Sequence, residues 1–63
     1  MLINYKTMDI NMLLSLVNMK LRNEKESLHD FCITYQIEES MLIERFKTNH
    51  LYYDITLNQF KQN

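Results

Sequence analysis

No glycine and no proline occurs in this 63-residue chain, and their absence constrains every turn that the chain can make. Glycine normally supplies left-handed backbone conformations, and proline normally fixes the first bend of a turn. Asn, Asp, Ser and Thr must therefore make the turns, and Asn can accept the left-handed conformation. We expect the turns where these four residue types interrupt the apolar pattern.

The length allows one domain, which we place at residues 1–63. A domain of this size has a stability of only about 3–5 kcal/mol, so a partner subunit would help it considerably. The formal net charge is -1, which favours neither nucleic acid nor a membrane surface as a partner.

The cysteine content bears on the compartment. Cys32 is the single cysteine, so the chain cannot form an intrachain disulfide, which a secreted chain this short would usually need.

The N-terminal residues do not resemble a signal peptide, because Asp9 interrupts them and no small-residue cleavage site follows. No apolar run approaches the ~18 residues of a membrane-spanning helix. We expect a cytoplasmic protein.

The first half of the chain predicts an arm and a helix. Residues 1–8 contain Leu2, Ile3 and Tyr5, and we expect them to form a short extended arm. A helix is predicted over residues 9–23, because Asp9 can cap it by accepting hydrogen bonds from the free N–H groups of its first turn.

Two further helices are predicted, over residues 27–36 and 39–48. Ser27 followed by Asp30 resembles a capping box, and acidic residues precede the last helix at its positive dipole end. The apolar positions Leu28, Phe31, Cys32 and Tyr35 follow helical spacing. Residues 51–61 predict a β-hairpin, with Asp54 opening its turn and Asn58 as the left-handed residue.

Together these elements predict an α+β fold that is mostly α. It is a three-helix unit with a C-terminal β-hairpin, in which helices 27–36 and 39–48 have the spacing of a helix-turn-helix. The residues expected to be buried together are Leu14, Val17, Phe31, Leu42 and Phe46, one or two from the core stripe of each helix.

The helix over residues 9–23 is apolar on two sides. Its expected core stripe contains Ile10, Leu13, Leu14, Val17 and Leu21. A second stripe, on nearly the opposite side, contains Met12, Leu16 and Met19. We favour a covered stripe, with the arm and hairpin folded over it and Tyr53 or Phe60 against it. The other interpretation is a protein interface, simplest as a homodimer, because flexible Met side chains suit an adaptable contact.

Catalytic, cofactor-binding and metal-binding residues are not predicted. His29 and Cys32 are three residues apart, but zinc needs about four ligands and the chain offers few. A Cys–His nucleophile would need an oxyanion hole, and phosphate-binding loops need glycine. We expect neither an enzyme nor a small-molecule substrate.

The stretches "MDINMLLSLVNMKLRN", "SLHDFCITYQIEESMLIERFK" and "YYDITLNQF" resemble a family of short bacterial proteins called domain of unknown function 4250. Members often have Asp-Pro where this chain has Asp9-Ile10, and proline suits a first helical position. Members tend to have Gly where this chain has His50. The resemblance implies no activity and no catalytic residues.

The expected function is a protein-interaction module, with Met12, Leu16 and Met19 as the candidate interface and self-association as one form. The alternative is a helix-turn-helix nucleic-acid binder. Its recognition helix would carry Glu38, Glu39 and Glu44 toward phosphates, which repel them, and the basic residues are scattered. We therefore expect no specific binding to duplex DNA.

Overall fold

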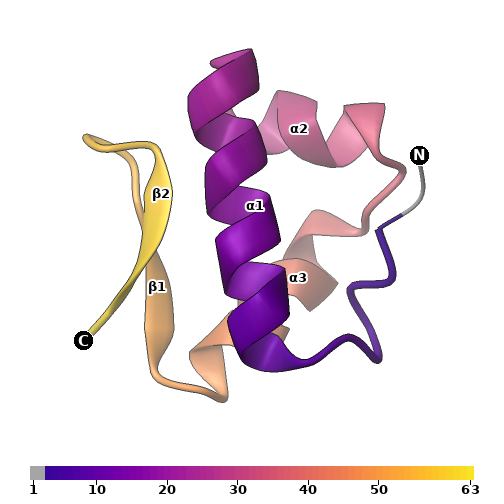
Figure 1. Cartoon of the computed structure of the whole chain (residues 1–63), viewed down its shortest axis with the longest axis vertical. Helices are drawn as coiled ribbons and strands as arrows, with labels where there is room; N and C mark the ends of the chain where they lie inside the picture. Colours follow the sequence, from indigo (N-terminus) through magenta and orange to yellow (C-terminus); the bar gives the residue numbers. More distant parts are fainter. Residues whose placement is uncertain (1–2) are drawn as a thin grey trace.

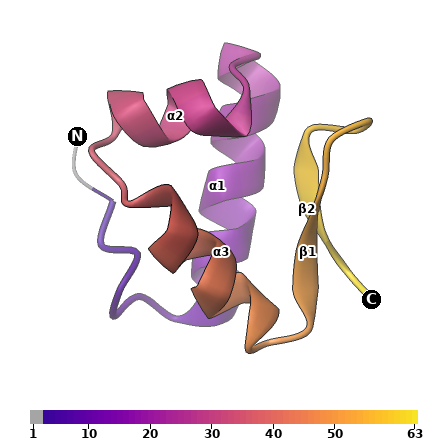
Figure 2. The ribbon, with the colours of Figure 1, turned by 180° about the vertical axis from the view of Figure 1, so that it is seen from behind.

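The computed structural model describes residues 3–63 and confirms an α+β fold that is mostly α. Three helices, α1 (Ile10–Glu24), α2 (Leu28–Thr34) and α3 (Glu39–Lys47), precede the strands β1 (Leu51–Asp54) and β2 (Gln59–Gln62). In the view of Figure 1, α1 stands in front, the hairpin lies to its left, and α2 and α3 lie behind it to the right. Seen from behind, α2 and α3 lie in front of α1 (Figure 2). In the part described, no helix is long and apolar enough to span a bilayer.

The two expected N-caps are present. The Asp9 carboxylate accepts hydrogen bonds from the backbone N–H groups of Asn11 (3.0 Å) and Met12 (3.1 Å). The Ser27 hydroxyl accepts one from the N–H of Asp30 at 3.1 Å, which starts α2. Each cap satisfies N–H groups that the first turn of a helix leaves without a partner.

α2 ends two residues earlier than expected, because the chain turns left-handed at Gln36, where φ is 56°. The N–H of Ile37 donates to the carbonyl of Cys32 (2.8 Å) and that of Gln36 to the carbonyl of Ile33 (3.2 Å). These two bonds form a Schellman motif, whose left-handed position is usually occupied by Gly. In this chain a glutamine occupies it.

The expectation that Asn, Asp, Ser and Thr would make the turns is wrong for most of the residues with left-handed backbone. Within residues 3–63, four residues have positive φ: Lys25, Gln36, His50 and Asn58. Asn58, with φ 51°, is the one that was expected. The other three follow helices, where the helix end and the next packed element together determine the backbone conformation against its intrinsic preference.

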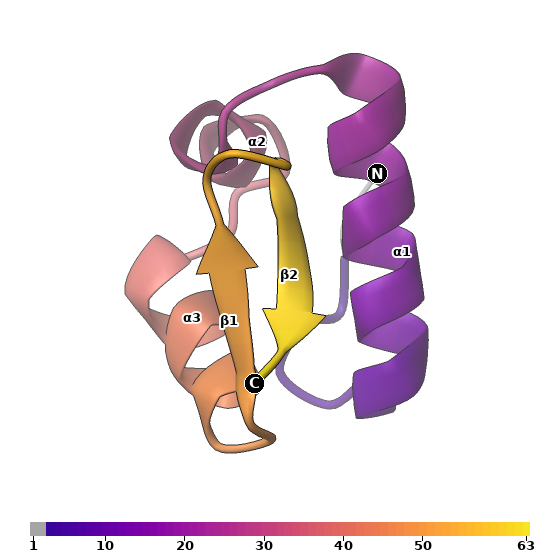
Figure 3. The ribbon, with the colours of Figure 1, turned by 90° about the vertical axis from the view of Figure 1, so that its left-hand side faces the viewer.

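The hairpin is antiparallel, with Tyr53 opposite Phe60 and Asp54 opposite Gln59. Asp54 opens its turn as expected, since its carboxylate accepts from the N–H groups of Thr56 (2.9 Å) and Leu57 (3.2 Å). β2 lies beside α1 and β1 beside α3, so the hairpin bridges the first and third helices (Figure 3).

The core lies between α1, the other two helices and the hairpin. Its buried side chains are Ile3, Leu13, Val17, Leu21, Leu28, Phe31, Cys32, Ile37, Leu42, Phe46 and Phe60. Four of the five predicted core residues are fully buried, but Leu14 is only half-buried. Because successive helical residues are 100° apart, Leu13 takes the central position and Leu14 falls at the edge of the core.

The expected extended arm is instead folded into turns over residues 5–8, while residues 1–2 lie outside the described part. The N–H of Met8 donates to the carbonyl of Asn4 at 3.0 Å, and Ile3 is buried in the core. The guanidinium of Arg45 donates to the carbonyl of Tyr5 at 2.7 Å. The arm is therefore attached to α3.

Candidate functional site

The outer side of α1 carries the second apolar stripe, and two of its three residues are exposed. Met12 is 60% exposed and Met19 is 40% exposed, while Leu16 is half-buried and packs against the core. With Met8, Asn11 and Ser15, these residues line an open groove of about 510 Å³. We call Met8, Met12, Leu16 and Met19 the methionine face.

The prediction that the arm and hairpin cover this stripe is wrong for Met12 and Met19. The two aromatic residues that were expected to lie against it take part in other contacts. The Phe60 ring lies 4.3 Å from the Phe46 ring and 5.4 Å from the Tyr53 ring, centroid to centroid. The interpretation of the stripe as an interface stays a prediction.

The hairpin is attached to α1 by the side-chain amide of Asn18. Its Nδ2 donates to the carbonyl of Phe60 at 3.0 Å, and its Oδ1 accepts from the N–H of Phe60 at 2.8 Å. The amide thus takes the place that a neighbouring strand would occupy along the outer edge of β2. Asn18 could not be identified from the sequence, because a single asparagine in a helix gives no signal of a partner in a distant strand.

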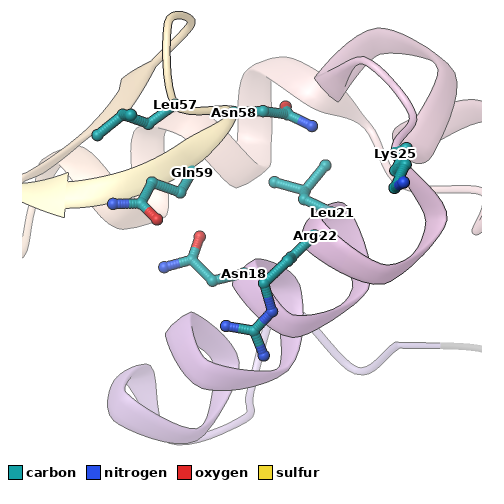
Figure 4. Close-up of a pocket in the computed structure, with 7 residues that line it drawn as sticks. All are labelled: Asn18, Leu21, Arg22, Lys25, Leu57, Asn58 and Gln59. Carbon is teal, nitrogen blue, oxygen red and sulfur yellow. The ribbon is translucent and has the colours of Figure 1, made fainter.

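A second amide joins the turn of the hairpin to the α1–α2 connection. Asn58 Nδ2 donates to the carbonyl of Glu26 at 2.8 Å, and the hydroxyl of Tyr53 donates to Asn58 Oδ1. A cleft of about 350 Å³ lies between the end of α1 and this turn (Figure 4). The residues that line it are Asn18, Leu21, Arg22, Lys25, Leu57, Asn58 and Gln59.

This cleft is a structural joint. Two of the amides that line it, Asn18 and Asn58, already bond the backbone of β2 and of the α1–α2 connection. It also lies at the C-terminal end of α1, where the basic side chains of Arg22 and Lys25 offset the negative end of the helix dipole. The joint explains why the hairpin leaves the methionine face open.

The charges around the methionine face are placed at its borders. Lys20 is turned away from it: the side chain is only 18% exposed, with its Nζ 5.0 Å from the centroid of the Tyr35 ring and 3.9 Å from Glu24. Asp9 caps the start of α1 and Arg22 lies in its last turn. The middle of the face therefore carries no charge.

The two residues of α2 that were considered for chemistry differ in their exposure to solvent. Cys32 is buried in the core, and burial, helped by the nearby carboxylates of Glu39 and Glu38, raises the pKa of its thiol to about 11. His29 is exposed, with its Nδ1 3.1 Å from Glu39 Oε1. Among residues 3–63, no three His, Cys, Asp or Glu side chains gather in a metal-binding group.

The exposed side of α3 combines acidic and apolar residues. Glu38 and Glu39 stand at its start, and Met41 and Ile43 are exposed along it. One of its basic residues, Arg45, is bonded to the arm through Tyr5. The start of α3, which a helix-turn-helix protein would turn toward DNA, is therefore acidic, and the basic residues Arg45 and Lys47 lie in its last turn.

Comparison with known proteins gives one finding. No curated protein and no solved structure matches the chain. A family model matches residues 7–60, which span the whole stretch from the end of the arm to Phe60 in β2. That family is described as a domain of unknown function, DUF4250, and the chain belongs to it.

Proposed function

We propose that this chain is a non-catalytic protein-interaction module and that it binds its partner through the methionine face. The observation that carries the proposal is the exposure of Met12 and Met19 on the outer side of the longest helix. They line a groove together with Met8 and Leu16, so the exposed apolar surface is continuous along α1. Large contiguous apolar patches on a protein surface usually mark interaction sites.

The chemistry of the face suits a protein partner. Methionine side chains are flexible and polarizable, and they adapt to the shape of a contacting surface. A helix that lies on a membrane would carry a row of Lys and Arg beside its apolar face. Here Lys20 is folded over Tyr35, and among the described residues those that line the groove include no Lys or Arg.

The absence of catalysis is part of the proposal, and Cys32 supports it. A nucleophilic cysteine needs an accessible thiolate. Cys32 is buried, and its thiol pKa of about 11 keeps it protonated near neutral pH. A free buried thiol also suits a reducing compartment, so we place the protein in the cytoplasm.

The test is site-specific photo-crosslinking. A photo-reactive amino acid replaces Met12, and in a matched control it replaces Ile55, which is 82% exposed at the tip of the hairpin. Both variants are irradiated in concentrated native lysate, and the products are identified by mass spectrometry. We expect discrete protein adducts at position 12 that are absent at position 55.

Identical adduct patterns at the two positions would contradict the proposal. A parallel sample without irradiation, washed at moderate salt, addresses the helix-turn-helix alternative. Co-purified nucleic acid that survives this wash would favour a nucleic-acid binder, because non-specific contacts to phosphates weaken steeply with salt.

A further inference from the structure

The methionine face has an internal symmetry of residue types. Met12 precedes the Ser15–Leu16 pair by about one helical turn, and Met19 follows that pair by about one turn. A two-fold axis through the middle of α1 would therefore set Met12 of one copy opposite Met19 of a second copy, and the reverse. Such mutual contacts are what a two-fold interface requires.

We propose that the partner of the methionine face is a second copy of this chain, with the two α1 helices packed antiparallel about Ser15–Leu16. This inference rests on the proposed function and names the partner for that surface. Ser15 is exposed, and its small side chain lies at the centre of the contact. A small central residue lets two helix axes approach closely, while the methionines on either side fill the remaining space.

The charges at the borders of the face select the antiparallel arrangement. Asp9 lies at the start of α1 and Arg22 in its last turn. Antiparallel packing sets the acidic residue at the start of each α1 near the basic residue in the last turn of the other. It also places the positive dipole end of each helix beside the negative dipole end of the other, which is favourable. Parallel packing would bring like charges together at both ends.

The position of Lys20 removes the remaining obstacle. A lysine that pointed out of the middle of α1 would meet the same lysine of the second copy, or a methionine of that copy, across the interface. Instead its ammonium lies over the Tyr35 ring at 5.0 Å and beside Glu24 at 3.9 Å. The centre of the face is therefore free of the charge that would oppose self-association.

The size of the contact predicts how strong the association is. A 15-residue helix such as α1 is about 22 Å long. One face of a helix this long buries less than the roughly 1,200 Å² of total surface that stable complexes need. The dimer is therefore weak and reversible, and its population rises with protein concentration.

The experiment is disulfide mapping with the full chain. Met12→Cys with a short terminal tag is mixed with untagged Met19→Cys at high concentration and oxidised gently. The tag separates the mixed dimer from the two like–like dimers by size. Cys32 does not compete, because it is buried. Ile55→Cys, mixed with itself, measures random collision.

We expect the mixed dimer to exceed the two like–like dimers combined and to exceed the Ile55→Cys background at least several-fold. Cross-linking at the Ile55→Cys level, or a dominant Met12→Cys homodimer, would overturn the antiparallel pairing. Circular dichroism of each variant verifies that it is folded, which the exposure of both positions favours.

Sedimentation equilibrium separates this inference from the proposed function. The unmodified chain should shift toward dimer as concentration rises, while Met19→Glu stays monomeric with unchanged helix content. A chain that stays monomeric at millimolar concentration overturns self-pairing. If photo-crosslinking at position 12 then still captures another protein, the proposed function stands without it.

Discussion

The inner and outer faces of α1 are both apolar, yet only one is covered. Leu13, Val17 and Leu21 on the inner face are fully buried, whereas Met12 and Met19 on the outer face are exposed. Both sets recur at helical spacing, so the periodicity that identifies a face does not determine whether another element will cover it.

The difference shows what positions the hairpin in so small a domain. Its large apolar residue, Phe60, packs on Phe46 in the core, and its outer edge is bonded by Asn18. Those contacts place β2 beside the flank of α1 and leave no further segment for the outer face. The hydrogen bonds along the outer edge of β2, and not the burial of apolar area alone, therefore determine which face of α1 is covered.

The largest expected effect concerns the core that the inner face closes. Phe46 is fully buried and its ring stacks against Phe60. Phe46→Ala should lower the free energy of unfolding by about 3–5 kcal/mol, through lost burial and the cavity left behind. This loss is as large as the stability expected of so small a domain, so circular dichroism without urea should show that the variant has lost most of its helix signal. Ile43→Ala, exposed on the same helix, is the control and should change little. If both variants unfold like the parent, α3 does not close this core.

The second prediction tests the hydrogen bonds that attach the hairpin to α1. Asn18→Leu keeps the forked shape of the side chain but leaves the N–H and carbonyl of Phe60 without their partner. We expect a loss of about 1–3 kcal/mol, the usual cost of partly buried polar groups that lack hydrogen bonds. Hydrogen exchange at the Phe60 amide should speed up. Asn23→Leu, on an exposed position of α1, serves as the control, and an equal effect in both variants would show that Asn18 does not anchor β2.

The features that could be predicted are local ones. The caps at Asp9 and Ser27 and the turn at Asp54 depend on side chains that bond backbone groups two or three residues away. Such contacts are encoded within a short stretch, so residue type and spacing are enough to predict them. The apolar stripes were likewise predicted as sets of residues.

The features that could not be predicted depend on distant parts of the chain. The bond between Asn18 and Phe60 joins residues that are 42 positions apart, and an isolated asparagine gives no signal of such a partner. Gln36 and His50 adopt left-handed backbone against their intrinsic preference, because the packing of neighbouring elements overrides it. The exposure of the methionine face follows from these long-range contacts and backbone conformations.

The third prediction concerns the connection that directs the hairpin toward α1. His50 has φ 63°, and its backbone N–H and carbonyl bond Lys47 and Asn63. His50→Gly should raise the free energy of unfolding by about 0.5–1 kcal/mol. It relieves the left-handed strain of a residue with a Cβ, but part of this gain is offset by the greater flexibility of glycine in the unfolded chain.

The matched control for His50→Gly is Thr48→Gly, two residues earlier, where the backbone is right-handed with φ -65°. There glycine relieves nothing and also removes the hydroxyl that donates to Arg45, so stability should fall. Thermal unfolding of both variants gives the comparison. A loss of stability in His50→Gly would mean that the imidazole has a stabilising contact that outweighs the backbone strain.

The smallest expected effect compares the two faces directly at neighbouring positions. Met12→Lys places a charge on the exposed face and should change the free energy of unfolding by no more than about 0.5 kcal/mol. Leu13→Lys places the same charge in the core without a partner and should prevent folding. Circular dichroism at low protein concentration, where self-association does not contribute, measures both. If Met12→Lys also unfolded the chain, the outer face would be covered after all, and neither the proposed interface nor the antiparallel pairing could use it.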